Sequence, residues 1–118
     1  MPTVLVRTDE FTPATYNSPA LVKQVSAALK SAIGADNVVP KDPTMGGEDF
    51  SEYSLPDHSI PAFIFRVGAV DPAKAAASKK TGAPLPSLHS SKFAPVPEAT
   101  IRTGLIGMTS AVLDLLQK

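Results

Sequence analysis

The sequence contains no cysteine, which excludes disulfide bonds and thiolate metal sites. It also lacks an excess of charge, because 11 Lys and Arg balance 11 Asp and Glu and no basic run occurs. A neutral chain without a basic patch is not expected to bind nucleic acid or a membrane surface. Residues 1–7 have neither the basic start nor the apolar length of a signal peptide, and no run of about 18 apolar residues predicts a membrane span. We therefore expect a soluble, cytoplasmic protein.

Several catalytic motifs are absent as well. The chain has no G-x-S-x-G elbow, no phosphate-binding P-loop and no H-E-x-x-H motif. Its only histidines are His58 and His89, whereas a catalytic zinc takes about three protein ligands. Ser90 and Ser91 adjoin His89, but sequence neighbours alone do not make a catalytic triad. The residues by themselves identify no complete active site.

Two long helices are predicted in a chain whose 118 residues and 43% hydrophobic content suit one globular domain. Ser18 and Pro19 form a cap and first-turn pair, and apolar residues then recur at helical spacing until Gly34, which predicts a helix at 19–33. A second helix is predicted at about 97–117. Its apolar residues at helical spacing are Ile101, Leu105, Met108, Val112, Leu115 and Leu116, with Gly104 and Gly107 placed for close approach to a neighbour.

Three short segments have the composition of strands: "TVLVR" at 3–7, "NVVP" at 37–40 and "PAFIFRVGAV" at 61–70. The last is nearly continuously apolar, as in a parallel strand covered on both faces. Residues 71–88 read as a surface loop with a helical turn at 72–79. These elements predict an α/β fold, a partial three-layer sandwich with helices packed on an incomplete, mostly parallel sheet. Three strands are few for an open sheet, so we expect either self-association or a missing partner segment.

The stretch "PTMGGEDFSEY" at 43–53 permits two interpretations. In the first, two glycines make a turn, and Glu48 and Asp49 begin a short helix whose dipole they offset. In the second, the glycines let a ligand approach the backbone while free N–H groups face a carboxylate. Spacing alone favours the first interpretation and leaves the second open.

The two histidines lie in predicted loops. His58 stands between prolines in a turn beside Asp57 and receives no role. His89 precedes the last helix, and its residue type alone favours a structural role. The alternative is that His89 is one metal ligand whose companions lie elsewhere.

Taken together, "PTMGGEDFSEY" and the later "LHSSKF", with "AFIFRVG" between them and a long helix at the end, resemble the C-terminal part of a known enzyme family. This is the metal-dependent aminoacylase and carboxypeptidase family, especially its hippurate hydrolase and auxin-conjugate amidohydrolase branch. The "YNSPAL" entry to the first helix is similar to the family too. The resemblance extends from about residue 13 to the end of the chain.

The resemblance implies a two-domain hydrolase with a two-metal centre, zinc or manganese, that cleaves the amide bond of N-acyl amino acids or small peptides. By this likeness His89 binds a metal, and the loop of Met45, Gly46, Gly47, Glu48 and Asp49 lines the substrate cleft. No catalytic residue is assigned. Residues 1–12 would be the last strand of an inserted lid domain and its return, and residues 13–118 the C-terminal segment of the catalytic domain.

Two hypotheses follow. In the first, the chain is a C-terminal fragment of a metal-dependent amidohydrolase and is inactive alone, because the family's other ligands and its catalytic glutamate lie in a missing N-terminal segment. In the second, the chain is a non-catalytic module that uses part of the hydrolase fold to bind a protein partner, since an incomplete sheet leaves apolar surface to cover.

Overall fold

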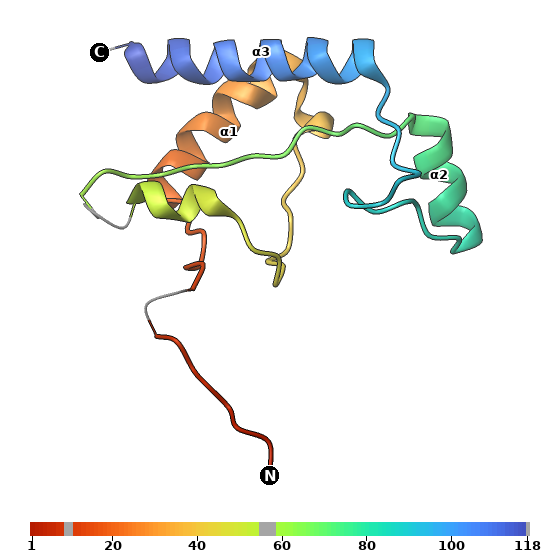
Figure 1. Ribbon diagram of the computed structural model, residues 1–118. Helices are drawn as coiled ribbons and strands as arrows, with labels where there is room; N and C mark the ends of the chain where they lie inside the picture. The colour runs from red at the N-terminus through yellow and green to blue at the C-terminus, as the bar shows by residue number, and fades with distance from the viewer. Residues whose placement is uncertain (9–10, 55–58, 118) are drawn as a thin grey trace.

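Three α-helices and two 3-10 helices form the regular structure of the described part of the chain (Figure 1). The computed structural model describes residues 1–8, 11–54 and 59–117. Its elements are α1 (Pro19–Ile33), η1 (Ala35–Asn37), η2 (Asp49–Ser54), α2 (Pro72–Thr81) and α3 (Pro97–Leu116). The predicted helices at 19–33 and 97–117 are confirmed. The helical turn predicted at 72–79 is a full helix, α2.

The ends of α1 follow from its flanking residues. Ser18 occupies the N-cap position, and its carbonyl accepts a hydrogen bond from the Val22 N–H at 2.9 Å. Gly34 ends the helix with φ 90°, a conformation that side chains disfavour, and its N–H donates to the carbonyl of Lys30 at 3.0 Å. The predicted stop at Gly34 is therefore confirmed.

The core lies where α1 crosses α3. Its buried hydrophobic residues are Val25 and Leu29 of α1 and Ala111 of α3. Val38, Phe63 and Phe65 pack against them and are only partly buried. This core is small for a chain of 118 residues. It brings together side chains of α1, of α3 and of the extended segment that contains Phe63 and Phe65.

Gly107 permits the close contact between the helices. A Cβ atom on Gly107 would lie 3.4 Å from Leu29 Cδ2 and 3.5 Å from Phe65 Cε2, which is van der Waals contact, so a side chain larger than a methyl group would have to displace these neighbours. The same Cβ on Gly104 would meet nothing within 4 Å. The prediction of close approach is confirmed for Gly107 and wrong for Gly104.

The predicted α/β fold is wrong: within residues 1–8, 11–54 and 59–117 the chain forms no strand and no sheet. Residues 61–67 are extended, but their polar backbone groups do not meet another extended segment. Ala62 accepts a hydrogen bond from the Ser18 N–H at 2.9 Å, while Ile64 bonds to a side chain. β-rich composition indicates an extended, half-buried segment and does not supply the neighbouring strand that a ladder requires.

That side chain is Asn17, just before α1. Its Nδ2 donates to the Ile64 carbonyl at 2.8 Å, and its Oδ1 accepts from the Ile64 N–H at 2.9 Å. One amide side chain thus satisfies both backbone groups of Ile64, as a neighbouring strand would. Asn17 and Ser18 together fix the extended segment to the start of α1.

The protein is open in shape, and its N-terminal segment extends away from the helices (Figure 1). Its radius of gyration is 17.8 Å, against about 13.5 Å for a compact domain of this length. Its accessible surface is 10008 Å², whereas a compact 12.3 kDa monomer exposes about 6,100 Å². The molecule leaves uncovered far more surface than a self-sufficient domain does.

α3 carries eight of the exposed large hydrophobic residues: Ile101, Leu105, Ile106, Met108, Val112, Leu113, Leu115 and Leu116. This helix has 20 residues, and its most apolar 18-residue window has a mean hydropathy of 1.2. By length and composition alone, it could cross a membrane. Only 11% of that window is buried in the structure. This test is less strict than the run of about 18 apolar residues that the sequence lacks, because α3 contains Glu98, Arg102 and Asp114. A single such helix is weak evidence of membrane insertion, because helices of soluble proteins also pass this test. The cytoplasmic location stays a prediction.

The Gly107 contact predicts a position-specific effect on stability. Gly107→Leu should lower the free energy of unfolding by about 1–3 kcal/mol, because the new side chain must displace Leu29 and Phe65. Gly104→Leu is the matched control and should be neutral or stabilising by about 0.5–1 kcal/mol through helix propensity. Urea denaturation of the two variants compares them directly. Equal losses in both would contradict the contact.

Candidate functional site

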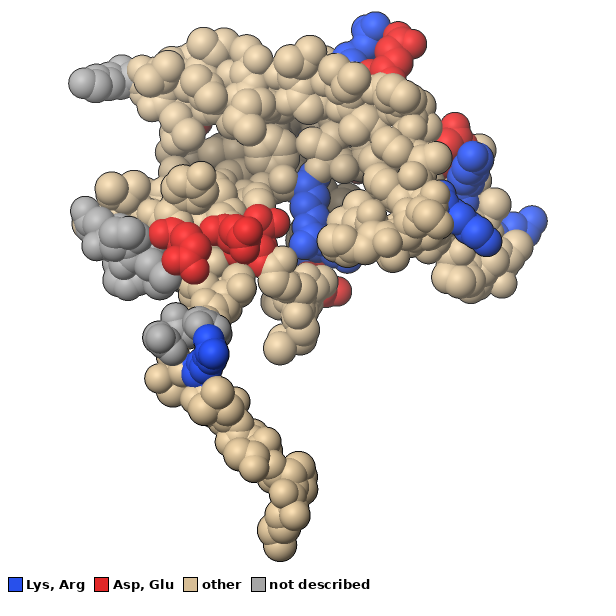
Figure 2. Space-filling view, viewed as in Figure 1, with Lys and Arg blue, Asp and Glu red and all other residues tan. Residues whose placement is uncertain are grey.

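The predicted cleft loop precedes η2 and is open to solvent. Met45, Gly46, Gly47, Glu48 and Asp49 are all exposed. Figure 2 shows acidic groups gathered over η2, where Glu48, Asp49 and Glu52 are exposed. The loop therefore presents a flexible apolar side chain, two glycines and several carboxylates on one accessible surface.

Neither glycine of this loop is required by the local structure. Among the described residues only Gly34 and Gly82 have positive φ, so the loop glycines adopt a backbone open to any residue. A Cβ on Gly46 would meet nothing within 4 Å, and one on Gly47 would touch only Thr12 Cγ2 at 3.9 Å. A turn alone therefore does not explain why residues 46 and 47 are glycines rather than residues with side chains. The close approach of another molecule to the backbone would explain it.

Glu48 has a structural role at the start of η2. Its Oε1 accepts a hydrogen bond from the Phe50 N–H at 3.3 Å. Its carbonyl accepts from the Ser51 hydroxyl at 2.8 Å and from the Ser51 N–H at 3.3 Å. Asp49 lies in the first turn of η2, as predicted. The predicted first-turn position is confirmed for Asp49, whereas Glu48 lies just before η2 and accepts hydrogen bonds from its first residues.

Ser51 is a residue that the sequence analysis missed. It is 2% exposed, the most buried polar residue described, and its hydroxyl bonds to Glu48. No feature of "EDFSEY" distinguishes Ser51 from the other serines, because its burial depends on tertiary packing. Ser51 holds the backbone of Glu48 and thereby fixes the end of the cleft loop.

His89 lies in a pair of consecutive turns before α3. The Ser90 N–H bonds to the Ser87 carbonyl at 3.0 Å, and the Phe93 N–H bonds to the Ser90 carbonyl at 3.0 Å. These turns leave the imidazole of His89 exposed, without a hydrogen-bond partner among the described residues. The side chain is therefore accessible to a ligand.

The structure does not assemble these residues into a metal site. No hydrogen bond or ion pair joins the Met45–Asp49 loop to His89, and no group of three or more His, Asp or Glu side chains suited to a metal occurs in residues 1–8, 11–54 and 59–117. His58 lies outside the described residues. The described residues alone do not fit a two-metal centre, so any complete centre needs ligands from elsewhere.

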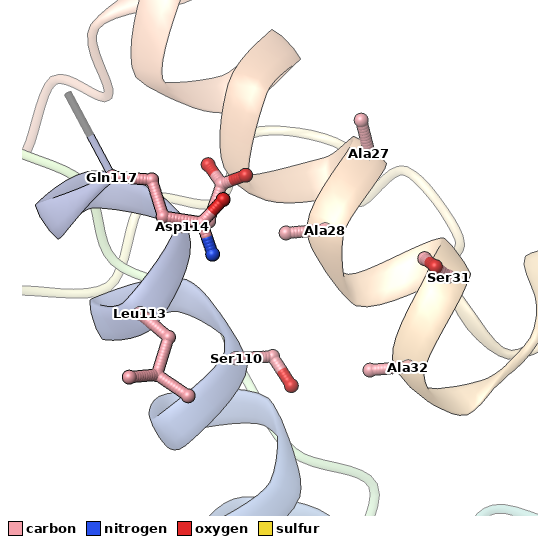
Figure 3. Close-up of a pocket in the computed structure, with 8 residues that line it drawn as sticks. All are labelled: Ala27, Ala28, Ser31, Ala32, Ser110, Leu113, Asp114 and Gln117. Atoms are coloured by element: carbon pink, nitrogen blue, oxygen red, sulfur yellow. The ribbon is translucent and has the colours of Figure 1, made fainter.

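A hollow lies away from these candidates, between α1 and α3 (Figure 3). It is an open groove of about 450 Å³. Its lining residues are Ala27, Ala28, Ser31, Ala32, Ser110, Leu113, Asp114 and Gln117. Gln24 Nε2 donates to Asp114 Oδ2 at 2.9 Å and joins the two helices. The groove contains none of the predicted site residues, and small side chains in both helices account for it.

A family model described as peptidase family M20/M25/M40 matches residues 3–88 of the chain. The chain belongs to this family. Searches of curated proteins and of solved structures found no match. The M20 match includes the Met45–Asp49 loop and ends one residue before His89. Membership therefore supports a hydrolase assignment, while the ligand role of His89 stays a prediction.

Because the described residues contain no cluster of three metal ligands, we predict that this M20-family chain alone binds metal weakly. Calorimetric titration with zinc and with manganese should show no tight, stoichiometric binding, because His89 has no companion ligands among the described residues. The His89→Ala variant should titrate like the unchanged protein. Tight binding that this substitution abolishes would mean that the chain completes a site by itself.

Proposed function

We propose that this chain supplies a cleft loop and one metal ligand to a metal-dependent amidohydrolase that cleaves N-acyl amino acids or small peptides. The M20 family match over the Met45–Asp49 loop is the observation that carries this proposal. The narrower likeness to hippurate and auxin-conjugate hydrolases rests on "LHSSKF" and on the loop sequence together.

The unconstrained glycines support the role of the loop. Gly46 and Gly47 have neither positive φ nor a close neighbour that would forbid a side chain. A substrate that lies against the backbone requires small residues in the cleft wall. Exposed N–H groups at such a wall suit the carboxylate of an N-acyl amino acid.

The exposure of His89 supports its role as a ligand. Its imidazole is open and lacks a hydrogen-bond partner among the described residues, so a metal held by another polypeptide segment can reach it. Bound divalent metal would polarise the scissile amide carbonyl and activate water. The other ligands and the catalytic glutamate would come from residues outside this sequence, and the chain alone would be inactive.

A second candidate function is that of a non-catalytic interaction module. The observation that favours it is the exposed apolar surface of α3, where Ile101 is 61% and Leu105 64% exposed. This function requires no metal. It predicts binding to a partner without hydrolysis.

Complementation tests the catalytic proposal. Mixing the chain with a polypeptide that carries the family's other ligands and glutamate should produce metal-dependent hydrolysis of benzoylglycine. His89→Ala should reduce kcat/KM at least about 100-fold, more than loss of an outer-sphere group. His58→Ala is the control for loss of a histidine and should change the rate little.

Two results would contradict this proposal. A stable complex of the two polypeptides without hydrolysis would exclude the catalytic role and leave the interaction module. Hydrolysis that is unaffected by His89→Ala would exclude His89 as a ligand.

A further inference from the structure

The chain that leads into α1 touches the cleft loop. We call residues 12–18 the α1 entry segment. The hydroxyl of Thr15 donates to the Glu48 carbonyl at 3.4 Å. Thr12 lies beside the loop too, because a Cβ on Gly47 would be 3.9 Å from Thr12 Cγ2. Figure 1 shows this segment passing beside η2 on its way into α1. Two residues of the cleft loop therefore lie against the α1 entry segment.

The same segment is joined to residues 62–64 by three hydrogen bonds. The Ser18 N–H donates to the Ala62 carbonyl at 2.9 Å. The Asn17 amide donates to the Ile64 carbonyl at 2.8 Å and accepts from the Ile64 N–H at 2.9 Å. Asn17, Ser18 and Ile64 are half-buried, which strengthens these bonds relative to bonds in water. The α1 entry segment is thus fixed at its end and reaches the cleft loop from there.

The Glu48 carbonyl is the point at which the segment meets the loop. This carbonyl accepts hydrogen bonds from the Ser51 hydroxyl at 2.8 Å, from the Ser51 N–H at 3.3 Å and from the Thr15 hydroxyl. The two bonds from Ser51 are local, whereas the bond from Thr15 joins residues 33 apart in sequence. Because a peptide group is planar, holding this carbonyl also orients the peptide that joins Glu48 to Asp49.

We propose that Thr15 and Asn17 are positioning residues of the cleft loop. Asn17 fixes the α1 entry segment against residues 62–64, and Thr15 holds the loop to that segment at Glu48. Neither residue touches substrate in this proposal. Each acts through the loop, because a binding group is effective only when the residues behind it hold it in place. The inference rests on the proposed function, which makes the loop a wall of the substrate cleft.

NMR relaxation of the 118-residue chain tests the positioning without catalysis. Thr15→Val removes the hydroxyl at nearly constant shape, and the order parameters of the Gly46 and Gly47 amides should fall by at least about 0.1. Thr15→Ser keeps the hydroxyl and should match the unchanged chain. Thr12→Val is the matched control, because it makes the same change in the same segment at a hydroxyl without a hydrogen-bond partner among the described residues.

Kinetics of the complex with the polypeptide that carries the other ligands test the effect on substrate. With benzoylglycine, Thr15→Val should raise KM about 2–10-fold and change kcat less than about twofold, because a hydrogen bond that supports binding is lost. Thr15→Ser and Thr12→Val should leave both constants unchanged. A merely structural role would instead lower the fraction of folded protein, and so reduce kcat at unchanged KM.

Asn17→Leu removes both bonds to Ile64 and should raise KM more than Thr15→Val does. Circular dichroism shows whether this variant keeps its helices. Thr15→Val leaves the Ile64 bonds intact, so the test does not depend on the folding of Asn17→Leu.

The two measurements separate failure of this inference from failure of the proposed function. Equal order parameters in Thr15→Val and Thr15→Ser would overturn the positioning role, whether or not the complex is active. Lower order parameters with an unchanged KM would overturn it as well, because the loop would then move without effect on substrate. A complex of the unchanged chain that hydrolyses nothing would contradict the proposed function and with it any role of Thr15 and Asn17 in substrate binding.

Discussion

The close contact of α3 with α1 and with the extended segment at Gly107 is the interaction on which the rest of the structure depends. It lets α3 lie directly against Leu29 of α1 and against Phe65 of the extended segment. Three parts of the chain that are far apart in sequence meet at this point. The small residues Gly107 and Ala111 of α3 face inward, and its large apolar residues are exposed.

The same contact positions both parts of the candidate site. Residues 61–67 connect the η2 region to α2, and they are held at one point by Phe65 in the core and at another by the Asn17 side chain on Ile64. The cleft loop lies before this segment and the turns around His89 lie after α2 (Figure 1). Both parts of the candidate site are thus exposed, and within residues 1–8, 11–54 and 59–117 they lack the companion ligands that a metal centre needs.

The helices could be predicted from sequence because their signals are local. Pro19 and Gly34 determine where α1 begins and ends, and apolar spacing determined α3. The prediction of a sheet was wrong, because the composition of residues 61–70 indicates an extended chain but not its hydrogen-bond partners. Here one of these partners is the side chain of Asn17 and not a neighbouring strand. The first-turn position of Asp49 was predictable, whereas the burial of Ser51 depends on contacts that sequence does not encode locally.

We propose that His89 belongs to a metal site that is completed by residues of another polypeptide segment. Anomalous diffraction at the zinc edge, from crystals of the chain complexed with a polypeptide carrying the other ligands, tests it most directly. The account predicts zinc about 2.0–2.1 Å from an imidazole nitrogen of His89, with the Met45–Asp49 loop beside it. A complex that binds zinc and hydrolyses substrate while His89 remains in solvent would contradict the account.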